Sequence, residues 1–241
     1  MSTHSYNDEL KSALGQRLLV IDGAMGTAIQ ALNLGPDDFG GAKYEGCNEY
    51  LTLTRPGLIE DIHRSYLDAG ADIIETNTFG STPVVLAEYE LAHEARRLNR
   101  EAATLARRAA DATSTPDKPR FVAGSMGPTT KTISVTGGIT FEELAGDYRI
   151  QAAGLIEGGV DLLLLETSQD TLNVKSGLEG IDRAFAELGR EVPVAVQGTV
   201  EPMGTLLAGQ DVEAFYTSLA HRDLLWIGLN CATGPNFMTD H

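Results

Sequence analysis

Six short apolar runs alternate along the chain with stretches that have the periodicity of amphipathic helices. The runs are rich in leucine and β-branched residues and lie at 18–22, 72–76, 121–127, 161–166, 194–199 and 224–230. Short, continuously apolar runs are typical of strands that are buried on both faces of a parallel sheet. Because helical stretches separate the runs, the sequence predicts an α/β fold in which helical crossovers join parallel strands.

The stretches between the runs carry start and stop signals for helices. Thr54 and Pro56 predict the start of a helix that ends at Gly70, because proline suits a first turn and glycine suits the residue after the last turn. Thr140 and Glu143 have capping-box spacing ahead of another helix. Further helices are expected over 84–112, 174–188 and 212–220.

Polar or glycine-rich residues follow each run, at 22–27, 75–79, 124–128, 166–167, 198–199 and 230–231. In a (β/α)8 barrel of the TIM type all strands end at one mouth, whereas a doubly wound sheet gathers only the strand ends beside its switch point. We therefore expect the barrel. A complete barrel has eight strand–helix units. About six are recognisable, so we expect an incomplete barrel, with 1–17 as a polar N-terminal segment and 18–241 as a partial barrel domain.

Charge and cysteine content exclude several classes of partner. The chain has 34 acidic residues against 18 Lys and Arg, so its field repels nucleic acid and anionic membrane surfaces. No apolar stretch is long enough for a membrane span or placed as a signal peptide, and a cytoplasmic location is expected. Two cysteines, Cys47 and Cys231, are too few for a disulfide framework and suit a reducing compartment.

Taken together and in order, the motifs at the strand ends resemble the homocysteine S-methyltransferase family. The motifs are DGAMGT at 22–27, ADIIETNTF at 71–79, GPT at 127–129, LET at 165–167 and GLNC at 228–231. The stretches 124–134 and 209–216 resemble the cobalamin-dependent members of the family more than the betaine- or S-methylmethionine-dependent members. A betaine- or S-methylmethionine-dependent homocysteine methyltransferase stays open as an alternative. The resemblance covers about residues 18–235.

The resemblance implies a zinc ion held by three cysteine thiolates, with an open position for the sulfur of homocysteine. Zinc would keep that sulfur deprotonated, ready to accept a methyl group and give methionine. Methylcobalamin on a separate module would donate the methyl group, which comes ultimately from 5-methyltetrahydrofolate. Cys231 matches the first ligand and is the expected catalytic and metal-binding residue. No cysteine follows it, so the zinc site is incomplete in this chain, and weak or no zinc binding is expected.

The resemblance also implies roles for residues at other strand ends. Asp22 and Glu166 would hold the amino group of homocysteine as ionised carboxylates, although helix capping or backbone contacts would also explain them. Asn77 would orient the pocket or simply form an Asx turn. A glycine-rich turn would receive the substrate carboxylate on its amides or serve as a structural turn, and its expected binding residues are Gly124, Ser125 and Met126.

Other interpretations stay open at this point. The chain could be a truncated, noncatalytic remnant, or a homocysteine-binding subunit that needs a second chain or a cobalamin- or folate-binding module to complete it. A different barrel enzyme that binds a phosphorylated ligand is a third possibility. Cys47 matches no expected ligand position, and Cys231 as a plain buried thiol is the simplest alternative. His63 and His221 lack metal-ligand spacing and are expected at the surface.

Overall fold

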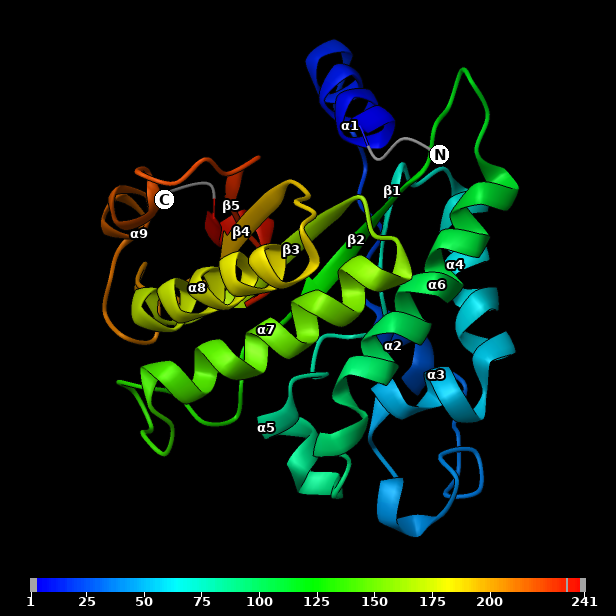
Figure 1. Ribbon diagram of the computed structural model, residues 1–241, viewed down its shortest axis with the longest axis horizontal. Coiled ribbons are helices and arrows are strands. Elements are labelled where there is room, and N and C mark those ends of the chain that lie inside the picture. The colour runs from blue at the N-terminus through cyan, green and yellow to red at the C-terminus, as the bar shows by residue number, and fades with distance from the viewer. Residues whose placement is uncertain (1–3, 233, 239–241) are drawn as a thin grey trace.

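The computed structural model describes residues 4–232 and 234–238 and shows an α/β fold around one parallel sheet (Figure 1). The strands are β1 (Ile73–Glu75), β2 (Phe121–Met126), β3 (Leu162–Ser168), β4 (Val194–Gly198) and β5 (Ile227–Leu229). Their order in the sheet is their order in the chain, with every pair parallel. In a doubly wound sheet the order of successive strands reverses at a switch point. The order of the strands in this sheet does not reverse. Within the described residues, no pairing closes the sheet into a barrel.

Five of the six predicted strands therefore form, and the prediction of a strand at 18–22 is wrong. This stretch meets β1 at a single bridge, between Ile21 and Ile73. The ladder is interrupted because the amide of Val20 donates to the carboxylate of Asp72 at 2.9 Å instead of to a strand carbonyl. The amides of Asp72 and Ile73 both donate to the carbonyl of Val20.

Helices follow the strands and cover one face of the sheet. Figure 1 shows α6, α7 and α8 packed side by side in front of the strands, and these pairs share many contacts. The α-helices are α1 (His4–Gln16), α2 (Met25–Gln30), α3 (Leu51–Thr54), α4 (Pro56–Ala69), α5 (Pro83–Leu86), α6 (Ala95–Thr113), α7 (Phe141–Gly158), α8 (Thr171–Leu188), α9 (Val212–Leu219) and α10 (Pro235–Met238). No helix in the described part of the chain combines the length and apolar character needed to cross a bilayer.

Several predicted helix boundaries are confirmed and two are wrong. The capping box of Thr140 and Glu143 forms at the start of α7, and Gly70 ends α4 in the left-handed conformation. Thr54 does not cap α4, because it is the last residue of α3. The helix predicted over 84–112 is divided into α5, two short 3-10 turns and α6, because Glu90 adopts a left-handed φ of 59° that an α-helix does not accommodate.

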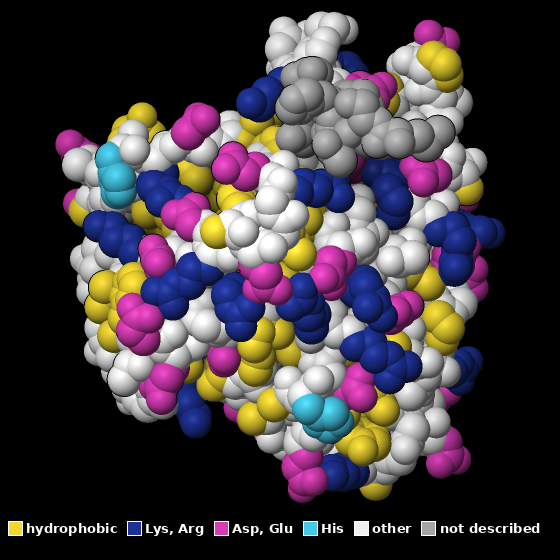
Figure 2. Space-filling view, viewed as in Figure 1, with side chains coloured by type: hydrophobic (Ala, Val, Ile, Leu, Met, Phe, Trp, Pro, Cys, Tyr) yellow, Lys and Arg dark blue, Asp and Glu magenta, His cyan; other side chains and the backbone are white. Residues whose placement is uncertain are grey.

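Ion pairs join the helices at the surface. Figure 2 shows acidic and basic side chains interspersed over this face. Arg96 of α6 contacts Glu157 of α7 and Glu187 of α8, each at 2.6 Å. Because these groups are partly exposed, each pair contributes little to stability, and the apolar contacts beneath them hold the layer.

The two faces of the sheet belong to different apolar clusters. Alternate residues such as Ile74, Val122 and Leu163 pack against the helices. Their neighbours, including Ile73 and Phe121, face the other side and pack with Leu10 of α1. Helix α1 thus packs on the face of the sheet opposite α6, α7 and α8, which we call the inner face. Just after α1, Arg17 forms an ion pair with Asp72 at 2.8 Å.

Close packing of α6, α7 and α8 depends on glycine. A Cβ at Gly154 of α7 would lie 2.5 Å from the carbonyl oxygen of Arg96, and one at Gly180 of α8 would lie 2.5 Å from that of Ala145. Gly146, also in α7, has no heavy atom within 4 Å of such a Cβ.

We predict that Gly154→Ala lowers the free energy of unfolding by about 1 to 2 kcal/mol, because overpacking outweighs the better helix propensity of alanine. Gly146→Ala, the matched control, should raise it by up to about 1 kcal/mol. Urea unfolding measures both values. Equal effects of the two substitutions would contradict the packing argument.

His63 is completely buried, so the prediction that it lies at the surface is wrong. It lies on the same face of α4 as Ile59 and Leu67, each one helical turn away. Neither ring nitrogen has a hydrogen-bond partner among the described residues. Burial lowers the pKa of His63 to about 4, so the imidazole is neutral at pH 7.

A lowered histidine pKa makes the fold sensitive to acid. Above the unfolded pKa of about 6.5, His63 is neutral in both states and the fold keeps its full stability. As the pH falls from there through the folded value of about 4, the unfolded chain binds a proton that the buried ring does not. The free energy of unfolding therefore falls, by about 3 kcal/mol at most. We expect His63→Leu to lose less unfolding free energy than the wild type between pH 7 and pH 4.5 in urea titrations. His221→Gln, at an exposed histidine, should behave like the wild type.

Candidate active site

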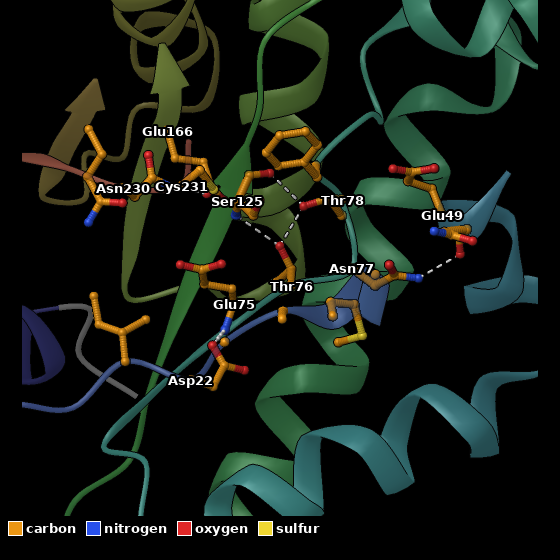
Figure 3. Close-up of a pocket in the computed structure, with 18 residues that line it drawn as sticks. Asp22, Glu49, Glu75, Thr76, Asn77, Thr78, Ser125, Glu166, Asn230 and Cys231 are labelled. Atoms are coloured by element: carbon orange, nitrogen blue, oxygen red, sulfur yellow. Dashed lines mark hydrogen bonds between the residues drawn. The ribbon is translucent and has the colours of Figure 1, made fainter. Parts of the chain in front are cut away.

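A cavity of about 520 Å³ lies where the strands end (Figure 3). Residues from seven segments of the chain meet there, although they are up to 210 positions apart in the sequence. The described residues that line it include no lysine, arginine or histidine. The lining residues are Ile21, Asp22, Gly23, Ala24, Met25, Gly26, Asn48, Glu49, Glu75, Thr76, Asn77, Thr78, Phe79, Ser125, Glu166, Gln197, Asn230 and Cys231.

Strand alternation decides which residues reach the cavity. Ser125 and Glu166 continue the inner face of their strands, and both side chains line the cavity. Met126 points the other way and is buried among the residues that face the helices. Gly124 also faces the helices, since a Cβ there would meet Leu155 at 3.0 Å. Of the three residues predicted from this turn, the structure brings Ser125 alone to the cavity.

The amides of the same turn are largely occupied. The amide of Ser125 donates to Oγ1 of Thr76 at 3.0 Å, and that of Gly127 donates to the carbonyl of Phe79 at 3.0 Å. Two of the amides expected to receive a substrate carboxylate therefore already have partners within the protein.

Glu166 is buried at the end of β3 and is held by several donors. Oγ of Ser125 donates to its Oε1 at 2.6 Å, and Nδ2 of Asn230 donates to its Oε2 at 2.9 Å. Burial raises the pKa of Glu166, while these hydrogen bonds act in the opposite direction by favouring the carboxylate. The side chain is thus fixed with its carboxyl group at the cavity.

Asp22 lies across the cavity, beside the end of β1. Its Oδ1 accepts a hydrogen bond from the amide of Glu75 at 2.9 Å. Burial is the main reason that the pKa of Asp22 is raised to about 8, and the nearby charge of Glu166 adds to the effect. Burial thus favours the protonated form of Asp22.

A hydroxyl network supports the wall between β1 and β2. Oγ1 of Thr76 and Oγ1 of Thr78 are 2.6 Å apart, and Thr78 donates to the carbonyl of Ser125 at 2.7 Å. Asn77 is buried and donates to the carbonyl of Asn48 at 2.8 Å, which joins the loop after β1 to the loop before α3. The structure thus gives Asn77 a bracing contact at the rim of the cavity.

Two cavity carboxyl groups were missed by the sequence analysis. Glu75 ends β1 on its inner face and lies beside Asp22 and Glu166. Glu49 is placed by the amide of Gly80, which donates to it at 2.8 Å. The signal for Glu75 was a charged residue at the end of an otherwise apolar strand, within a motif already singled out.

Cys231 is exposed at the edge of the cavity, just after β5. Its backbone has a φ of 58°, and its Sγ accepts a hydrogen bond from Oγ1 of Thr167 at 3.5 Å. Thr167 also has a positive φ, of 54°, which is unusual for a β-branched residue. Cys47, by contrast, is buried among leucine side chains, and burial raises its pKa to about 12.

One residue that the resemblance implies as a zinc ligand, Cys231, lies at the cavity. No group of three or more His, Cys, Asp or Glu in the described part of the chain is arranged to hold a metal ion. Cys231 offers one thiol, which is a quarter of a tetrahedral shell.

Comparison with known proteins identifies the family of the chain. The sequence profile of the family described as homocysteine S-methyltransferase matches residues 19–241. The chain is 44% identical over 238 residues to the methionine synthases of Mycobacterium tuberculosis and Mycobacterium leprae. It belongs to the homocysteine S-methyltransferase family. The alignment covers 99% of this chain but 20% of each relative, so the chain spans about a fifth of the length of these proteins.

The fold is similar to that of a solved family member. The metallated form of the homocysteine methyltransferase MmuM from Escherichia coli matches with a TM-score of 0.74 at 22% sequence identity. The match covers 92% of this chain and 77% of that one. At this level of identity the likeness concerns the fold alone.

Asn230 joins the ends of β3 and β5, since its Oδ1 also accepts from the amide of Thr167 at 3.0 Å. We predict that Asn230→Ala lowers the free energy of unfolding by about 1 to 3 kcal/mol, because both groups lose a partner. Urea unfolding tests this against Asn236→Ala, at an exposed asparagine. Equal stabilities of the two variants would show that the bridge is dispensable.

Proposed function

We propose that this chain is the homocysteine-binding module of an enzyme of methionine synthase type. The carrying observation is that Asp22, Glu166 and Cys231 line one cavity. Two carboxyl groups suit the ammonium group of an amino acid, and a thiol at the edge suits a site where sulfur reacts. The 44% identity to two methionine synthases supports this choice within the family.

In this proposal, Asp22 and Glu166 bind and orient the amino group of homocysteine. Ser125 and Asn230 keep Glu166 ionised and fix its direction. Because burial raises the pKa of Asp22, an arriving ammonium group, which favours the charged carboxylate, acts against that shift. Each contact between opposite charges contributes about 1.5 to 3 kcal/mol and selects amino-acid thiols over simple thiols.

Cys231 would hold one coordination position of zinc in the complete protein. When bound, zinc would supply a deprotonated homocysteine sulfur as the nucleophile. We propose methylcobalamin on a separate module as the methyl donor, with 5-methyltetrahydrofolate as the ultimate source. The other zinc ligands, the cobalamin- or folate-binding module and the activity itself are assigned to the rest of a longer protein or to a second chain.

We also propose that the sheet is part of a (β/α)8 barrel. The strand order without reversal, the helices on one face and the cavity at the strand ends all support it. The likeness to MmuM in fold supports it further.

We predict that Asp22→Asn and Glu166→Gln each weaken homocysteine binding about 10- to 100-fold, because each removes one charge-assisted contact. Isothermal titration calorimetry of this chain with homocysteine measures the affinity. Asp68→Asn and Glu88→Gln, at exposed carboxylates, serve as matched controls and should leave it unchanged. Wild-type affinity in both cavity variants, or no saturable binding by the wild type at millimolar homocysteine, would contradict the proposed function.

A further inference from the structure

The cavity contains one carboxyl group more than the binding of an ammonium group requires. Glu75 lies between Asp22 and Glu166 in Figure 3, and all three line the same space. No basic side chain in the described part of the cavity compensates them. Three adjacent carboxylates would repel one another strongly in a buried position, so at least one must hold a proton.

The hydrogen-bond donors around the cavity distinguish the three groups. Glu166 accepts from Ser125 and Asn230, and Asp22 accepts from a backbone amide. In the described residues, no amide, amine or hydroxyl group donates to the carboxyl group of Glu75. Its partner is the carboxyl group of Glu166, and this contact favours the proton on Glu75 and the charge on Glu166.

We propose that Glu75 is a positioning residue that stays a neutral carboxylic acid at pH 7 and donates a hydrogen bond to Glu166. This contact holds Glu166 in place as a carboxylate. Once an ammonium group favours the carboxylate form of Asp22, the ligand meets two negative groups, those of Asp22 and Glu166, instead of three. The part of the proposal that concerns the ligand rests on the proposed function, whereas the protonation of Glu75 does not.

The surroundings of Glu75 agree with this assignment. Burial is the main reason that its pKa is raised, and the charges of Glu166 and Asp22 raise it further. Those two groups face it from β3 and from the stretch before α2. On β2, Glu75 pairs with Ala123, and Ser125 lies two residues further along the same face; neither side chain titrates. Glu49 and Cys231 are the other titratable groups that line the cavity in the described part of the chain.

Protonation can be measured without any ligand. We suggest ¹³C NMR of the whole chain labelled at the glutamate side-chain carboxyl groups, titrated from acid to alkaline pH. One resonance, absent in Glu75→Gln, should remain at the protonated position at pH 7. Ionisation of every glutamate at pH 7, which the wild type alone would reveal, would overturn the proposal.

Homocysteine titrations test the positioning role. Glu75→Met, which is apolar and has no donor, should weaken binding about tenfold. Glu75→Gln keeps a neutral donor and should restore most of that loss, with Glu88→Gln as the exposed control. If Glu75→Gln weakens binding as much as Glu166→Gln does, Glu75 contacts the ligand as a carboxylate and the proposal is wrong. If the wild type binds no homocysteine, the proposed function fails while the NMR result still decides the proton on Glu75.

Discussion

Side chains two residues apart in a strand point to the same face, and this period organises the whole molecule. Along β2, Phe121 and Ala123 point to the inner face of the sheet, while Val122 and Met126 pack against the helices. The same inner row that begins with apolar residues ends with Ser125, and the row in β3 ends with Glu166. The inner face of the strands therefore forms the apolar core along most of its length and the wall of the cavity at the strand ends. A shift in register by one residue would exchange the residues on the two faces of the sheet.

The cavity sets a strict condition on charge. Its carboxyl groups are buried or half-buried and have no lysine, arginine or histidine among the described lining residues. Burial therefore raises the pKa of each member of the Asp22, Glu75 and Glu166 group. Such a cavity favours a cationic group of the right size. The proposed function meets this preference, because homocysteine carries an ammonium group beside its thiol.

Strain is concentrated at the same edge. Thr167 and Cys231, two residues with positive φ, meet at their side chains, and Asn230 connects their strands. Residues held in such conformations are typical of sites where a side chain must point in a required direction. Here the thiol of Cys231 is presented at the edge of the cavity, while the thiol of Cys47 serves the apolar core.

The sequence by itself determined the order of the five strands, the capping box at Thr140, the stop at Gly70 and the motifs that identify the family. These features are local, since each depends on residues within one or two turns of the chain. The resemblance of its motifs to the family also predicted Asp22, Glu166 and Cys231 as site residues, and the structure places all three at one cavity.

Only the tertiary structure decided which residues of a buried strand point inward. A strand covered on both faces is apolar throughout, so its sequence does not label the inner face, and Gly124, Ser125 and Met126 could not be told apart. The burial of His63 and the interrupted pairing at 18–22 were not predicted for a different reason. Both depend on neighbours that are distant in the sequence. The proximity of Glu75 to Asp22 and Glu166 arises from three separate segments, and the resulting competition for a proton exists in the folded chain alone.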